Sequence, residues 1–214
     1  MKTSSHANHQ RLTGRPKSAA KREAILAAAG DLFLQEGVED TTMERIAERA
    51  GVSKQTLYSH FGNKEGLYEA VIRSKMQHYG LDSEAVDEHA TLHKALEELA
   101  RQFLDLTTDP EVVAMIRMLI TESSRNATTV SLFWRNGPDR AQRALAHRLA
   151  YWQSQGLLAV EDPDEEARLF FAALHSDHHM AQLMNRPVEW SPERRDRLAR
   201  LVTKRFLKAW GHDC

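Results

Sequence analysis

The chain has 214 residues, of which 42% are hydrophobic, 28% charged and 7% aromatic. This length suits one or two domains with a buried core, so the composition excludes a chain that is disordered throughout. Lysine plus arginine total 29 and aspartate plus glutamate total 30, so the net charge of -1 identifies no class of partner. The single cysteine, Cys214, excludes an internal disulfide and a zinc site built from several thiolates.

Charge is unevenly distributed along the chain. Through Arg22 there are six basic residues and no acidic residue, whereas the rest of the sequence is mildly acidic. A basic arm ahead of an acidic body predicts that a polyanion binds at one end. The first residues lack the apolar core of a signal peptide, and no apolar run reaches the ~20 residues that a membrane span requires. We therefore expect a cytoplasmic protein without a membrane partner.

Four helices are expected in the first third of the chain, over residues 18–37, 42–51, 53–61 and 64–79. Each contains apolar residues at helical spacing. Thr42 and Ser53 supply hydroxyls that cap the second and third helices, and Gly37 and Gly51 end the first and second. Residues 1–14 show no periodicity, and we interpret them as part of a flexible arm.

The region after a polar stretch at residues 82–89 also has helical periodicity. Helix starts are predicted at Thr91 and at three Asp-Pro or Ser-Pro pairs, because proline suits the first turn of a helix; the pairs are Asp109-Pro110, Asp162-Pro163 and Ser191-Pro192. Gly137-Pro138 separates two further helices. No β-type alternation is present, so the predicted fold is all-α, with about nine helices. The predicted division is a basic arm (1–17), a first helical domain (18–64) and a second helical domain (65–214).

The segment from Thr42 to Leu67 carries the clearest functional pattern. Two short helices that meet at a tight turn require a small residue in the first helix, a residue that tolerates positive φ in the turn, and an apolar anchor in the second helix. Ala47, Gly51 and Leu57 have these properties at the required spacing. This pattern is typical of a helix-turn-helix, whose second helix enters the major groove of DNA. The alternative is an ordinary helical hairpin.

The same region resembles the DNA-binding domain of the TetR/AcrR family of bacterial transcriptional regulators. The resemblance covers residues 24–72, roughly the first third of the chain, and its most specific part is the run Leu57-Tyr58-x-His60-Phe61-x-Asn63-Lys64. After residue 72 it is weaker. Phe133, Gly137-Pro138 and the segment Leu157 to Pro163 are similar to the AefR-like branch of the family.

The resemblance implies a set of DNA contacts. Residues on the exposed side of the third helix would reach base edges, and flanking hydroxyl, phenol and basic groups would contact phosphates. The basic arm would lie along or in the minor groove, or would simply be a soluble tail. The predicted DNA-binding residues are Arg15, Lys17, Thr42, Lys54, Gln55, Thr56, Tyr58, Ser59, His60 and Lys64.

The family also implies an effector pocket in the second domain. Such pockets have mostly apolar linings, so we expect an apolar or aromatic small molecule as the effector. The predicted lining residues are Met115, Met118, Leu119, Phe133, Trp134, Trp152, Phe171 and His175. The alternative is that these side chains are hydrophobic core.

His175 and His179 are four residues apart and would share one face of a helix, a spacing that suits a transition metal. Two histidines leave the coordination of a metal incomplete, so a polar or ligand-binding role is the alternative. We expect no cofactor.

The last two helices are predicted to form a homodimer interface through two apolar stripes. The predicted interface residues are Leu169, Phe170, Ala173, Leu198, Leu201, Val202 and Phe206. Burial inside one monomer would account for part of each stripe.

These features together predict a homodimeric transcriptional repressor, not an enzyme, that binds a palindromic double-stranded DNA operator and is released by a small-molecule effector. The alternatives are a metal-responsive regulator, a helical enzyme, or a sensor module that has lost DNA binding. No phosphate loop or nucleophile motif supports an enzyme.

Overall fold

The computed structural model describes residues 15–85 and 90–211, and side chains from residue 18 onward. This part of the chain contains ten helices and no strand, which confirms the all-α prediction. The helices are α1 (Arg15–Glu36), α2 (Met43–Arg49), α3 (Lys54–Phe61), α4 (Lys64–His78), α5 (Leu92–Thr108), α6 (Pro110–Glu122), α7 (Ala127–Asn136), α8 (Pro138–Ser154), α9 (Pro163–Leu183) and α10 (Pro192–Ala209). Helix α1 begins at Arg15, so its first three residues belong to the segment that we assigned to the arm.

Side-chain caps set the starts of most helices. Eight of the residues that immediately precede a helix accept a hydrogen bond from a backbone N–H group of the first turn. Seven stand at predicted helix starts, namely Thr42, Ser53, Asn63, Thr91, Asp109, Asp162 and Ser191, and the eighth is Asn126 before α7. These N–H groups have no partner within the helix, so each cap satisfies a donor that would otherwise be free. The seven predicted starts are confirmed.

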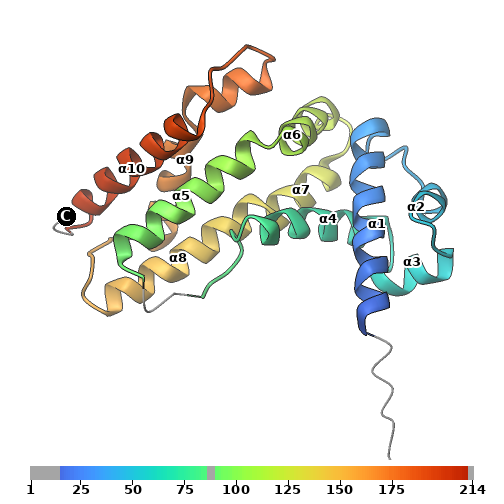
Figure 1. Ribbon diagram of the computed structural model, residues 1–214, viewed down its shortest axis with the longest axis horizontal. Helices are drawn as coiled ribbons and strands as arrows, with labels where there is room; N and C mark the ends of the chain where they lie inside the picture. Colours follow the sequence, from blue (N-terminus) through green and yellow to red (C-terminus); the bar gives the residue numbers. More distant parts are fainter. Residues whose placement is uncertain (1–14, 86–89, 212–214) are drawn as a thin grey trace, which may run out of the picture.

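Two hydrophobic cores divide the molecule. The first joins α1–α4 and includes Met115 and Leu119 from α6. The second joins α5, α8, α9 and α10. Figure 1 shows α1–α3 at one end of the molecule and α9–α10 at the other, with α4 between them.

Helix α4 belongs to both cores. Its first half contributes Leu67 and Ile72 to the first core, and Met76 near its end belongs to the second. The change of core therefore falls inside α4, several residues beyond the predicted domain boundary at residue 64. At the far end of α4, Tyr79 donates a hydrogen bond of 2.9 Å to Asp109, which also accepts one of 3.1 Å from Lys75.

Helix α9 is interrupted at Ser176. The backbone of Ser176 has φ 46° and ψ -170°, a conformation that breaks the helix into two segments. Positive φ is uncommon for residues other than glycine, and a sharp kink in a helix requires a local cause of this kind. The segment after the kink carries His178 and His179, and it ends where Arg117 of α6 donates to the carbonyl oxygens of Gln182 and Leu183.

Candidate nucleic-acid interface

Helices α2 and α3 meet at a tight turn whose geometry depends on three residues. Gly51 has φ 64°, and the N–H of Val52 donates to the carbonyl of Ala47 at 3.0 Å. Ala47 is 3% exposed and Leu57 is fully buried, so a small side chain and an apolar anchor occupy the angle between the helices. The structure therefore gives these residues the helix-turn-helix roles that their spacing predicts.

The outer face of α3 is polar and accessible. Lys54, Gln55, Ser59 and His60 are exposed, and Tyr58 is 45% exposed. These side chains come from one short helix, whose opposite face is anchored in the core by the buried Leu57. A helix presented in this way can lie in the major groove and bring several side chains to base edges and phosphates.

The predicted hydroxyl contacts have a local role as well. Thr42 caps α2 by accepting from the N–H of Arg45 at 3.3 Å. The hydroxyl of half-buried Thr56 lies 2.9 Å from that of Ser53, and Ser59 donates to the Thr56 carbonyl at 2.8 Å. A hydroxyl can donate and accept at once, so these groups retain capacity for a phosphate oxygen.

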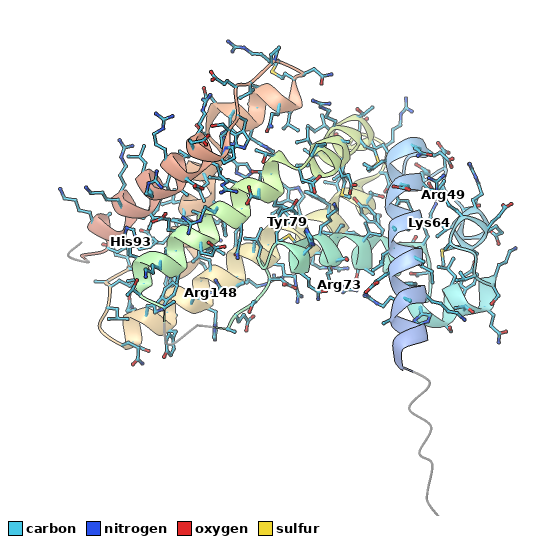
Figure 2. The ribbon with its side chains drawn as sticks, viewed as in Figure 1. Arg49, Lys64, Arg73, Tyr79, His93 and Arg148 are labelled. Carbon is cyan, nitrogen blue, oxygen red and sulfur yellow. The ribbon has the colours of Figure 1, made fainter. Side chains whose placement is uncertain are left out.

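Acidic side chains form ion pairs with basic side chains of the helix-turn-helix region. Lys54 forms an ion pair of 2.8 Å with Glu44, and the hydrogen bond from Lys54 lowers the pKa of that carboxyl group. Arg49 pairs with Asp31 at 3.1 Å (Figure 2). Exposed ion pairs of this kind contribute little free energy, so a phosphate group can compete for either cation.

Lys64 has partners inside the fold. Its ammonium group donates to the carbonyl oxygens of Glu39 and, at 3.0 Å, of Thr41, and the side chain is half-buried. It therefore fixes the loop between α1 and α2 to the start of α4. The predicted phosphate contact of Lys64 would have to coexist with these bonds. The side chains of Arg15 and Lys17, also predicted contacts, lie outside the described residues.

Gly66 joins α3 closely to α4. A Cβ atom at Gly66 would lie 2.4 Å from the carbonyl oxygen of Phe61, the last residue of α3. Any other residue would force the two helices apart at this point. The first turn of α4 is thus packed directly on the end of α3.

The predicted effector-lining residues fall in different parts of the structure. Four of them pack in or against the first core, next to the helix-turn-helix unit: Met115, Met118, Leu119 and Phe133. Trp152 and Phe171 are buried in the second core, and Trp134 is 51% exposed. His175 makes an edge contact with Phe103, with ring centroids 4.9 Å apart.

The two histidines proposed as metal ligands are close together. The ring centroids of His175 and His179 are 4.6 Å apart. Burial, together with the neighbouring His179 and His178, lowers the pKa of His175 to about 4, so the ring is neutral at physiological pH. Within residues 15–85 and 90–211, no three His, Cys, Asp or Glu side chains form a group that could hold a metal ion. Nothing in this region adds a third ligand to the pair.

The predicted dimer residues fall into two classes. Phe170 and Val202 are buried within the chain, and Leu198 and Phe206 are half-buried against its second core. Three are exposed: Leu169, Ala173 and Leu201. Their outer faces on α9 and α10 lack a partner within the described part of the chain, as an interface between two copies would require.

One contact between α6 and the loop after α1 has no signal in the sequence. Glu122, the last residue of α6, reaches the loop after α1, where its Oε1 lies 2.2 Å from the position that a Cβ atom of Gly37 would take. Burial and the nearby Glu39 and Asp40 raise the pKa of Glu122, and burial together with Glu122 raises that of Tyr68. Only the folded chain brings these residues together, so spacing along the sequence could not predict them.

The fold and the exposed third helix define a helix-turn-helix protein with a second, helical domain. Residues 25–71 match the family described as bacterial regulatory proteins, tetR family. Residues 94–212, more than half of the chain, match the AefR-like transcriptional repressor C-terminal domain. The chain belongs to the TetR family of bacterial transcriptional regulators, with an AefR-like second domain.

Individual relatives agree with this assignment. The chain is 41% identical over 91 residues to the HTH-type transcriptional regulator RutR of Escherichia coli, a match that spans 42% of this chain and 43% of RutR. It is similar to the structure of the flavonoid-responsive regulator FrrA, with 31% identity, a TM-score of 0.70 and coverage of 89% of this chain and 97% of FrrA. A TetR transcriptional regulator from Agrobacterium tumefaciens has 25% identity, a TM-score of 0.70 and coverage of 89% and 94%.

Among the helices in the described part of the chain, none combines the length and the apolar character needed to cross a bilayer.

Proposed function

We propose that the protein is a homodimeric repressor that binds a palindromic operator through α3 and dissociates when a small molecule binds the second domain. The observation that carries this proposal is the accessible polar face of α3, which projects from a buried helix-turn-helix core. Membership of the TetR family supports the same function.

A dimer would place two copies of α3 on one face of DNA. Recognition helices of symmetric dimers enter successive major grooves about 34–36 Å apart, so a two-fold operator is the expected target. The exposed Leu169, Ala173 and Leu201 support dimerisation through α9 and α10.

Effector control requires that the ligand favour a form of the dimer that fits DNA poorly. Coupling between two such sites is typically ~1–3 kcal/mol. The continuity of α4 through both cores supports this route, because a shift in the second core moves the first half of the same helix. The likeness to FrrA, a flavonoid-responsive regulator, supports a small organic molecule as the effector.

Substitution on α3 tests the DNA-binding part of the proposal. The variants Lys54→Ala and Tyr58→Ala should each lower affinity for the DNA upstream of the protein's own gene, by roughly 1–3 kcal/mol per lost contact. Fluorescence anisotropy over a range of salt concentrations measures this loss, and wild-type affinity should fall steeply with salt because phosphate contacts release counterions. Arg143→Ala, on the exposed surface of α8, is the matched control.

Substitution of Glu44 provides a variant that should not weaken DNA binding in the same assay. Glu44→Gln removes the carboxylate that pairs with Lys54 and so frees the cation and deletes a negative charge near the phosphates. We expect affinity equal to or above that of the wild type. Full affinity in both Lys54→Ala and Tyr58→Ala, with intact folding, would contradict the role of α3.

A further inference from the structure

A cavity of about 600 Å³ lies between α5 and α8, beside the end of α4. Ligand sites in proteins commonly have volumes of roughly 300–1,000 Å³, so this space is large enough for a small organic molecule. Its walls include apolar, basic and acidic side chains, among them the apolar Leu99 and Trp152, the cations Lys94, Arg101 and Arg148, and the carboxylates Glu97 and Glu98.

Arg148 is the unusual group in this wall (Figure 2). Its Nη2 donates to the carbonyl oxygen of Ser83 at 2.6 Å, and its Nε is buried with no hydrogen-bond partner. No carboxylate of the described residues pairs with it, and burial lowers the pKa of the guanidinium. Arginine nevertheless remains charged in proteins, so a partly desolvated cation is left with a neutral acceptor alone.

Two other arginines, one on α5 and one on α8, differ from Arg148 because each pairs with a carboxylate. Arg101 pairs with the carboxylates of both Glu97 and Glu98, so its positive charge is offset. Arg140, on the same helix as Arg148, pairs with Asp82 at 3.3 Å. Among the arginines with described side chains, Arg148 is the one with a buried N–H group that has no partner. Lys94 adds a second positive charge that no ion pair offsets within the described residues.

An apolar wall lies next to this charge. Trp152 follows Arg148 by one helical turn and is 4% exposed, and Leu99 of α5 is 3% exposed. A ligand that fits both features carries an anionic group and an apolar body. Guanidinium groups bind carboxylates with paired, charge-assisted hydrogen bonds, so a carboxylate matches Arg148 well.

We propose that this cavity is a binding site for an amphipathic carboxylate, with the carboxylate on Arg148 and the apolar body against Trp152 and Leu99. The claim that this cavity is the effector site rests on the proposed function. The claim that it binds a carboxylate ligand does not. A carboxylate would compete with the Ser83 carbonyl for Arg148. Since Ser83 follows α4 by a few residues, the ligand would loosen a bond that ties the end of α4 to α8.

Two matched pairs of probes test the site: naphthylacetate with naphthylacetamide, and decanoate with decanol. In titration calorimetry on the full chain, at least one carboxylate should bind at least tenfold more tightly than its neutral partner. Arg148→Gln should remove that preference, Arg148→Lys should keep part of it, and Arg143→Gln, exposed on the same helix, should leave it unchanged. Circular dichroism and thermal unfolding establish that each variant is folded.

The proposal is overturned if neither carboxylate binds at millimolar concentration, if charged and neutral probes bind equally, or if folded Arg148→Gln retains the preference. Operator binding by the ligand-free protein is measured separately. Operator binding without carboxylate binding would refute the site and leave the proposed function intact, and the reverse result would refute the function and leave the site intact.

Discussion

At Gly37 the side chain of Glu122 occupies the space where a Cβ atom would be. Gly37 also has φ 83°, a backbone conformation that glycine adopts at little cost and other residues adopt with strain. Gly37 is therefore constrained in two ways. The turn after α1 requires positive φ, and the contact with Glu122 of α6 leaves no space for a Cβ atom. A substitution at this position can separate them.

We expect Gly37→Ala to lower the free energy of unfolding by more than the ~1 kcal/mol that positive φ alone costs. The excess should disappear in the Glu122→Ala background, because the carboxylate that meets the new methyl group is then absent. Urea denaturation of the wild type, Gly37→Ala, Glu122→Ala and the double variant measures the cost of the backbone strain and the cost of the contact with Glu122.

Gly51→Ala is the control for the strain term. Gly51 has φ 64°, and no atom lies within 4 Å of the position of its Cβ. This variant should lose only the ~1 kcal/mol of backbone strain. Equal losses in Gly37→Ala and Gly51→Ala would refute the contact between Glu122 and Gly37 in solution.

Individual residues differ in how far the sequence predicts them. The exposure of Lys54, Gln55 and Tyr58 follows from helical spacing around Leu57, which is a local property. The environment of Lys64 and Arg148 does not follow from spacing, because loops and helices distant in sequence supply their partners. The roles predicted for single residues in DNA or ligand contact remain predictions.

At the scale of elements, capping chemistry made the helix starts predictable. A Ser, Thr, Asn or Asp side chain binds backbone groups two or three residues away, so its effect is contained in a short stretch of sequence. The break in α9 is different. Ser176 carries no helix-breaking signal of the kind that Gly or Pro gives, so periodicity predicts a continuous helix there.

The segment of α9 after this break should make stability depend on pH. His178 is 2% exposed, stacks on Trp190 with ring centroids 4.3 Å apart, and leaves its Nε2 without a partner. Burial lowers the pKa of His178 to about 4 from its ordinary value of 6.5, with His179 adding to the effect. Below pH 6.5 the unfolded chain binds a proton that the folded chain does not, so stability is complete above this pH and falls as the pH drops toward 4.

This dependence can be assigned with His178→Gln, which has no titrating ring. The urea midpoint of the wild type should fall between neutral pH and pH near 5, and the fall should be smaller in the variant. His147→Gln, at an exposed position on α8, should behave as the wild type does. An identical pH dependence in wild type and His178→Gln would contradict the burial of His178.

At the scale of the whole molecule, α6 supports the DNA-binding end. Met115 and Leu119, which are predicted to line an effector pocket, are buried against α1–α4. Apolar patterning shows that a side chain is buried and does not show which core it enters, so the sequence could not separate these roles. The same limit explains why the sequence did not predict that the division between the cores lies inside α4.

Met115→Ala should therefore destabilise the protein by about 2–5 kcal/mol, the usual cost of truncating a buried methionine. Met118 is a matched control, because it is only partly buried against the same core and should lose less on truncation. Chemical denaturation measures both variants. Wild-type stability in Met115→Ala would contradict this packing.

The proposed dimerisation through α9 and α10 predicts how a charge on α10 changes the assembly. Leu201→Asp places a charge on an exposed face of α10 and should give a monomer in analytical ultracentrifugation, together with weaker operator binding. Ile120→Asp, on α6, introduces the same charge at another exposed apolar residue and should remain dimeric. A dimeric Leu201→Asp protein would place the interface elsewhere.

The close approach at Gly66 has a mechanical consequence. Because the end of α3 touches the start of α4 with no room for a methyl group, the two helices cannot move closer together at their junction. In the proposed dimer, α3 would lie in the groove while the end of α4 reaches the second core. A tilt of α4 toward α3 would therefore push α3 with it.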